Sequence, residues 1–359
     1  MDFFKGEGKK AGNEVSIRTE ALPEDAFKRM KDPAGYRAAA DTVRAVNVAL
    51  ALKIPLLVGG EPGSGKTLLG GAVSYELGKV GPLTFVVKST SVARDLFYTF
   101  DAVRYFQAQP RKSADGSAAP PKPKDFIEYQ ALGLAILLAL PLEKRRPFLP
   151  DTLFNFNPAE ESELTPETQA MRAMLRGGEQ KQCVVVIDEV DKAPRDLPND
   201  ILDELDGMRF RVPELGGIET PSVPFDYRPI VFITTNSERQ LPDAFLRRCA
   251  FLFIDYPRGG ELEAIVGSRL TGVMEGGSPL LRDTVAFYEK VRADARLNKP
   301  PGTAELLQFL QAARVNGADP RKTIAQQRDV IINGIQLLAK MNQDLEPLKT
   351  ELRNWGGRG

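Results

Sequence analysis

The sequence of 359 residues contains no histidine and only two cysteines, Cys183 and Cys249. The absence of histidine excludes Ser-His-Asp hydrolysis, Cys-His proteolysis and His-ligated zinc. The two cysteines stand far apart in apolar contexts, so they give no metal-ligand spacing, and we interpret both as small core residues. A disulfide between them is not expected in a cytosolic protein. Acid–base chemistry in this chain must therefore fall to carboxylates, lysine or water.

The chain also lacks an excess of either charge and a long apolar run. Lys and Arg together number 48, as do Asp and Glu, and this balance disfavours a dedicated nucleic-acid binder. A local basic surface is still possible. The longest apolar run, at 131–142, is too short to span a bilayer, and the N-terminus has no continuous apolar segment typical of a signal peptide. We expect a soluble, cytoplasmic protein with no membrane span.

The sequence contains short β-branched apolar runs that alternate with helical patterns. Buried strands are predicted at 54–58, 83–90, 183–190, 230–236 and 250–257. After Pro257 only helical spacing remains, and helices are predicted at 260–270, 278–295, 302–317 and 324–341. The pattern predicts an α/β core with a five-stranded parallel sheet, followed by a small α-helical domain.

Composition sets the expected domain boundaries. Residues 1–33 form a polar N-terminal arm, 34–257 the α/β core and 258–359 the helical domain. Helices are predicted within the core at 35–52 and 93–107. The Pro-, Ala-, Ser- and Lys-rich stretch at about 108–124 cannot bury a core, so we expect an exposed, mobile insertion. A Gly-Gly pair between extended segments predicts a hairpin at about 208–227.

The segment GEPGSGKT, residues 60–67, matches the pattern G-x-x-x-x-G-K-T between a predicted strand and a predicted helix. We name it the glycine loop; the alternative reading is an ordinary glycine-rich turn. Its glycines let backbone N–H groups turn toward phosphates, and the helix N-terminus adds partial positive charge. Lys66 is expected to reach the β- and γ-phosphates, and Thr67 to offer its hydroxyl to Mg²⁺. The candidate nucleotide-binding residues are Gly60, Glu61, Pro62, Gly63, Ser64, Gly65, Lys66, Thr67 and Leu68.

Polar side chains at the ends of two other predicted strands would complete such a site. Asp188 ends one strand and is the expected second Mg²⁺ ligand, while Glu189 after it is the candidate base that polarises an attacking water. Capping of a helix N-terminus is the alternative role of these carboxylates. Asn236 ends the next strand, where its amide would orient the same water; a turn or helix cap is its alternative.

Two arginines, Arg247 and Arg248, follow a predicted short helix within LPDAFLRRC at 241–249. Arginines in a solvated turn are common, and that is their simplest role. In a ring ATPase, this position carries the arginine that enters the neighbour's nucleotide site and offsets charge in the transition state.

Because these motifs occur in this order along the chain, the sequence resembles AAA+ ATPases, and within them the MoxR-like group. The resemblance extends from about Pro33 to the final helices. The resemblance rests on GEPGSGKT as Walker A, VVVIDEVDKAP as Walker B, VFITTN as the sensor-1 strand and LPDAFLRRC as the arginine-finger segment. It implies an α/β P-loop NTPase core with an α-helical lid. It also implies ATP and Mg²⁺ bound between neighbours of a homo-oligomeric ring, usually a hexamer. Arg248 occupies the place of the family's finger.

The same resemblance implies a chaperone-like role in remodelling protein partners, often alongside a von Willebrand factor A domain protein. The chain departs from the family at sensor 2, because NKPPGTAELL at 298–307 has no arginine; Lys299 is a possible substitute. A nucleic-acid translocating motor and an ATP-binding scaffold with low turnover are the alternatives. Zero net charge disfavours the motor, and the intact Glu189 disfavours the scaffold, which needs no base.

Overall fold

The computed structural model describes residues 32–109, 120–271, 273–274, 276–294 and 296–356. The predicted N-terminal arm up to residue 31 and residues 110–119 of the predicted insertion lie outside this range. The chain divides into two compact units. The sheet unit comprises Ala38–Gly60 and Lys66–Ile254, and the helical unit comprises the chain from Asp255 together with residues 32–37 and Glu61–Gly65.

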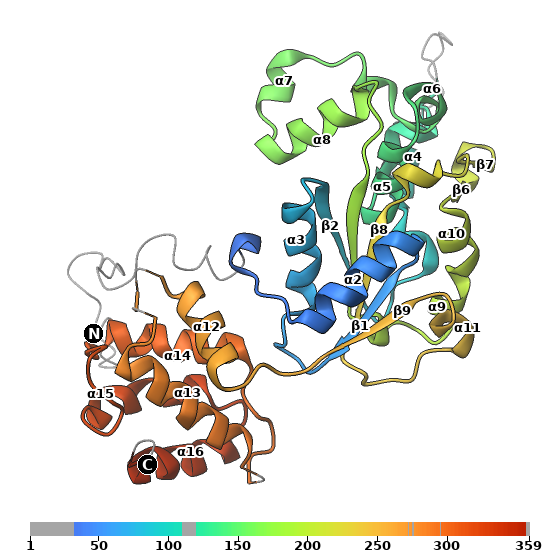
Figure 1. Cartoon of the computed structure of the whole chain (residues 1–359). Coiled ribbons are helices and arrows are strands. Elements are labelled where there is room, and N and C mark those ends of the chain that lie inside the picture. The colour runs from blue at the N-terminus through green and yellow to red at the C-terminus, as the bar shows by residue number, and fades with distance from the viewer. Residues whose placement is uncertain (1–31, 110–119, 272, 275, 295, 357–359) are drawn as a thin grey trace. The chain divides into compact units, whose positions relative to one another are not determined.

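The sheet unit is built on a five-stranded sheet whose neighbouring strands are all parallel, which confirms that part of the predicted fold. Its spatial order is β2-β5-β8-β1-β9. The strands are β1 (Leu56–Gly60), β2 (Val80–Val86), β5 (Cys183–Asp188), β8 (Ile230–Thr235) and β9 (Ala250–Ile254). Figure 1 shows them side by side between helices.

Helices cover both faces of this sheet, which explains why its central strands are apolar throughout. Alternate residues of a strand point to opposite faces. In β5, Val185 and Ile187 belong to a large apolar core that includes helix α5 (Ala131–Ala139), whereas Val186 faces helix α3 (Lys66–Glu76). Figure 1 shows α3 and α5 on the two sides of the sheet.

The remaining α-helices of the sheet unit lie around this framework. They are α2 (Ala40–Leu52), α4 (Ala102–Ala108), α6 (Leu142–Arg145), α7 (Pro158–Ser162), α8 (Pro166–Arg176), α9 (Leu197–Asp200), α10 (Leu202–Gly207) and α11 (Asp243–Leu246). Two antiparallel strand pairs join them: β3 (Tyr98–Phe100) with β4 (Ile127–Tyr129), and β6 (Arg211–Val212) with β7 (Ile218–Glu219). The second pair lies within the predicted hairpin region, and Gly216 and Gly217 between its strands adopt positive φ.

The predicted helix at 93–107 is wrong. The chain forms a 3-10 helix at Ala93–Leu96, then β3, and only then α4. Tyr98 is buried against Phe210, with ring centroids 6.2 Å apart, so the apolar residues here serve a tertiary core. Asp101 then begins α4 by accepting the backbone N–H of Arg104 at 2.8 Å. The strand predicted at 83–90 is displaced, because β2 begins at Val80 and ends at Val86.

The helical unit has its own apolar core. Its α-helices are α12 (Gly259–Arg269), α13 (Pro279–Arg292), α14 (Thr303–Val315), α15 (Arg328–Ile331) and α16 (Asn342–Asn354). The continuous helix predicted at 324–341 is wrong: α15 has four residues and passes into a 3-10 helix at Ile332–Leu337. Gly334 lies in this 3-10 segment, where a Cβ would stand 3.4 Å from Ala312 Cβ, so the segment runs tightly along α14.

Two general expectations can be compared with the described residues. Neither Cys183 nor Cys249 forms a disulfide, as predicted, and burial raises the pKa of both thiols to about 12. None of the helices in the described part of the chain combines the length and the apolar character that a membrane span requires.

Candidate nucleotide-binding site

The order of the sheet brings three motifs to one edge. Strands β5, β8 and β1 are neighbours, and parallel strands end on the same side. Asp188 is the last residue of β5, Asn236 follows β8, and the glycine loop begins at Gly60, the last residue of β1. Ligands of open parallel sheets bind beyond the carboxyl ends of the strands. Motifs that lie 48 to 176 residues apart in the sequence therefore converge at the position where such folds bind ligands.

The glycine loop has the backbone that its sequence predicts. Gly63 and Gly65 adopt φ values of 81° and 92°, a left-handed region in which side chains other than glycine are strained. Lys66 is the first residue of α3, and its Nζ donates to the carbonyl of Gly60 at 2.8 Å. This hydrogen bond directs the lysine side chain toward the end of β1. Ser64 Oγ is buried with no hydrogen-bond partner among the described residues.

The predicted metal ligands are in contact. Thr67 Oγ1 donates to Asp188 Oδ1 at 2.9 Å. Alternation along β5 places Asp188 on the same face as Val186, which is the face that α3 covers. Gly70, one turn after Thr67, packs so closely that a Cβ there would stand 2.3 Å from Val186 Cγ2. The glycine thus lets α3 approach β5, and this approach brings the hydroxyl to the carboxylate.

Thr234, the second-last residue of strand β8, was not among the predicted site residues. Its side chain is fully buried, its Oγ1 donates to Asp188 Oδ1 at 2.5 Å, and the same oxygen accepts the backbone N–H of Glu189 at 2.9 Å. One hydroxyl therefore orients the carboxylate of Asp188 and fixes the backbone of the next residue. The sequence signal was present as the pair of threonines before Asn236.

Glu189 is held in a left-handed conformation, with φ of 59°. Its carboxylate accepts the side-chain amide of Asn236, Nδ2 to Oε1, at 3.5 Å. Its other oxygen pairs with Lys192 Nζ at 2.5 Å, and this hydrogen bond is the main cause that raises the pKa of Lys192. The structure therefore places Glu189 and Asn236 in contact, and adds a lysine that the sequence interpretation did not select.

The two arginines of LPDAFLRRC lie at the end of α11. Arg248 Nε donates to Asp206 Oδ2 at 2.7 Å, and its Nη1 donates to the carbonyl of Ala244 at 3.1 Å. The Asp206 carboxylate raises the pKa of Arg248 above its usual value. Arg247 is exposed and makes no side-chain hydrogen bond or ion pair within the described ranges.

Within the helical unit, residues of the glycine loop contact Arg292 and Thr303. Thr303 Oγ1 donates to the carbonyl of Gly63 at 2.9 Å, and the Arg292 guanidinium pairs with Glu61. Arg292 also lies 3.7 Å from the ring centroid of Tyr256. Lys299 is exposed in the turn before α14. The helical-unit cation that contacts the loop is therefore Arg292, which the sequence interpretation did not select.

The donor set suits a phosphate and a hard cation. Along the chain, Ser64 has a buried hydroxyl without a partner among the described residues, and Gly63 and Gly65 adopt left-handed conformations; in the sheet unit, Lys66 begins an 11-residue helix. Each of these is a feature of anion-binding loops. In the described part of the chain, no three His, Cys, Asp or Glu side chains gather as a metal site. The hydroxyl of Thr67 and the carboxylate of Asp188 match the few oxygen ligands that Mg²⁺ takes from protein beside phosphates and water.

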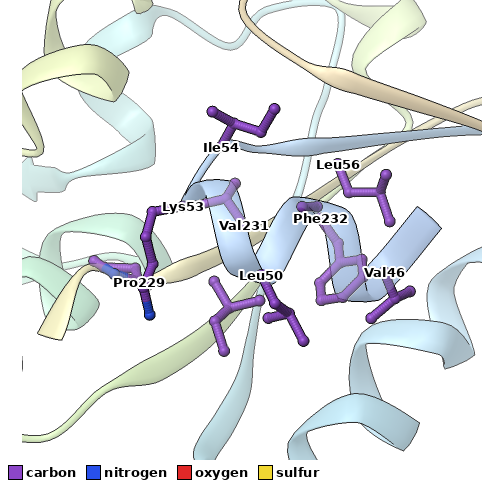
Figure 2. A pocket seen from close by; sticks show the side chains of 10 residues that line it. Val46, Leu50, Lys53, Ile54, Leu56, Pro229, Val231 and Phe232 are labelled. Atoms are coloured by element: carbon purple, nitrogen blue, oxygen red, sulfur yellow. The ribbon is translucent and has the colours of Figure 1, made fainter. Parts of the chain in front are cut away.

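A separate apolar cavity lies between α2 and the strands β1 and β8 (Figure 2). Val46 and Leu50 of α2 and Phe232 of β8 line it, with Lys53 at one side. Its volume of about 10 Å³ is close to the smallest that holds one water molecule. It is too small for a nucleotide and belongs to the packing of α2.

No protein-family model matches the chain, and no curated protein matches it. The resemblance to a family therefore rests on the sequence motifs alone.

Proposed function

We propose that the chain is a Mg²⁺-dependent ATPase of the AAA+ type, related to the MoxR-like group, with the helical unit as its lid. One observation carries the proposal: Thr67 and Asp188, 121 residues apart, are joined at 2.9 Å at the carboxyl edge of a parallel sheet. Thr67 belongs to the loop expected to hold phosphates, and Asp188 to the strand expected to hold the metal. An ordinary glycine-rich turn would require no such partner.

Each residue then has a role in hydrolysis. Lys66 and the backbone of the glycine loop bind the phosphates, and Thr67 and Asp188 hold Mg²⁺, which supplies positive charge to the phosphate oxygens. Glu189 accepts a proton from the attacking water, and the Asn236 amide orients that water. For this the Glu189 carboxylate must be available to water, so its pair with Lys192 must open or shift.

The resemblance extends the proposal to a ring that remodels or assembles protein partners. In such a ring Arg248 acts on the neighbour's nucleotide, for which it must leave Asp206. Arg247, which is exposed, is the alternative finger. A nucleic-acid motor remains the second candidate, and the balanced charge of the chain disfavours it.

Calorimetric titration with Mg·ATP tests the binding half of the proposal. The wild type and Glu189→Gln are expected to bind, because Glu189 acts only in hydrolysis. Lys66→Ala is expected to lose binding, because it removes the cation aimed at the β- and γ-phosphates. Lys79→Ala, which removes an exposed lysine in the turn before β2, is the matched control and should bind normally. Normal binding by Lys66→Ala would contradict the assignment of the loop.

A further inference from the structure

Asp191 is a buried carboxylate for which the proposed reaction gives no role. It lies two residues after Glu189 in the 3-10 turn Val190–Lys192, and its side chain is 3% exposed. Burial of a carboxylate is costly unless it is hydrogen-bonded, and among the described residues only Oδ2 of Asp191 has partners, while Oδ1 is buried without one. Those partners lie on another segment of the chain.

One oxygen of Asp191 holds the segment that follows β8. Oδ2 accepts the backbone N–H of Asn236 at 3.0 Å and that of Glu238 at 3.1 Å. Ser237 between them adopts a φ of 61°, a left-handed conformation that is unfavourable for serine. Two hydrogen bonds to one carboxyl oxygen therefore offset the strain of a tight turn.

The same segment returns to Glu189 through a side chain. The Asn236 amide donates to Glu189 Oε1 at 3.5 Å, while the Asn236 backbone is held by Asp191. The three residues Glu189, Asp191 and Asn236 are thus linked by hydrogen bonds. Asp191 fixes the backbone of Asn236, and the Asn236 side chain contacts Glu189. A displacement of the Asn236 backbone would move its amide away from Glu189.

We propose that Asp191 is a positioning residue for hydrolysis, which acts through Asn236 by holding its backbone so that its amide faces Glu189 and the attacking water. This inference rests on the proposed ATPase function. It predicts that Asp191 matters for the chemical step and not for nucleotide binding, because its contacts lie with the base and the Asn236 segment.

A double-mutant cycle tests this inference. Asp191→Ala is expected to lower kcat about 10- to 100-fold, the usual effect of losing an outer partner of a site residue, and to leave the Kd for Mg·ATP unchanged. Asn236→Ala is expected to lower kcat by itself. Because Asp191 acts through Asn236, adding Asp191→Ala to Asn236→Ala should cause no further loss.

Two variants separate positioning from folding. Asp191→Asn keeps an oxygen that can accept both N–H groups, so this variant should recover most of the wild-type kcat. If Asp191→Ala does not fold, Asp191→Asn takes its place in the double-mutant cycle. Asp283→Ala is the matched control, because Asp283 is also buried and accepts the backbone N–H of Ile324 at 2.7 Å in the helical unit. It should lower thermal stability and show no coupling to Asn236→Ala.

The outcomes distinguish this inference from the proposed function. A wild type that hydrolyses no ATP would overturn both. An active wild type in which Asp191→Ala keeps full kcat, or in which the two losses multiply, would overturn the role of Asp191 alone. Hydrogen exchange gives a readout independent of activity: the amides of Asn236 and Glu238 should exchange faster in Asp191→Ala, and unchanged exchange would contradict the positioning contact.

Discussion

At the scale of the residue, Thr234 shows how one hydroxyl can serve two neighbours. It donates to Asp188 and accepts from the backbone of Glu189, and it lies fully inside the protein. Its loss would leave the backbone N–H of Glu189 without this acceptor and would leave Thr67 as the remaining side-chain donor to Asp188 Oδ1 among the described residues. The expected cost is therefore both structural and functional, and two substitutions can separate the effects.

Thr234→Val, which keeps the shape of the side chain, should destabilise the folded state by about 1–3 kcal/mol, because a buried donor is left unsatisfied. It should also raise the Mg²⁺ concentration needed for half-maximal ATPase activity, because Asp188 is less firmly oriented. Thr234→Ser keeps the hydroxyl and should recover the Mg²⁺ dependence. Thermal unfolding and a Mg²⁺ titration of activity measure the two effects. An unchanged Mg²⁺ dependence in Thr234→Val would contradict this role.

At the scale of the element, the placement of α3 on β5 decides whether the site forms. Gly70 and Val186 meet where the helix crosses the strand, one turn from Thr67 and two residues from Asp188. A larger residue at either position would separate the helix from the strand. The glycine is therefore required by packing, and not by a special φ.

Gly70→Ala should destabilise the sheet unit by about 1–3 kcal/mol, the usual cost of overpacking, and should weaken binding of Mg·ATP. The added Cβ would clash with a side-chain methyl group, so Val186→Ala in the same chain should restore part of the lost stability. Gly260→Ala is the control, because this α12 glycine faces open space. Denaturant unfolding of the single and double variants measures the effect. Equal stability of Gly70→Ala and the wild type would contradict the packing argument.

The elements also show what could be predicted from the sequence. The five strands were recognised because each contains a short apolar run, and the three central strands, β5, β8 and β1, are buried on both faces. The helix at 93–107 was mispredicted because Leu96 and Tyr98 are buried in a tertiary core whose partners, such as Phe210, lie far along the chain. Periodicity records which residues are apolar but does not identify their partners.

Some residues of the candidate site could likewise be selected from the sequence, and others could not. Thr67, Asp188, Glu189 and Asn236 were selected as candidates because each stands at the end of a predicted element within a motif. Asp191, Thr234 and Arg292 were not selected, because their roles depend on contacts between segments 45 to 231 residues apart. Spacing along the chain carries no information about such contacts, so only the fold shows them.

At the scale of the whole molecule, the proposed ring requires two chains at each nucleotide. Within the sheet unit, Thr67 contacts Asp188 and Asn236 contacts Glu189, while Arg248 is bound to Asp206 at the end of α11. A finger supplied by a neighbour is worth about 10³–10⁵ in rate in other systems. Arg248→Ala should therefore reduce hydrolysis nearly as much as Glu189→Gln does.

Mixing these two inactive variants tests the shared site. Arg248→Ala and Glu189→Gln leave different halves defective, so some interfaces of a mixed ring should join an intact pocket to an intact finger. Part of the ATPase activity should return on mixing. Arg247→Ala replaces Arg248→Ala in a parallel mixture to show which arginine acts. A mixture that stays inactive although mixed rings form, or a fully active Arg248→Ala, would contradict the model.

The most direct test of the central claim is phosphate release from Mg·ATP by the wild type and by Glu189→Gln, both saturated with nucleotide. The account predicts steady hydrolysis by the wild type and a loss of at least about 10²-fold in the variant, because only the base is removed. Equal rates for the two proteins, or no hydrolysis by the wild type, would contradict it.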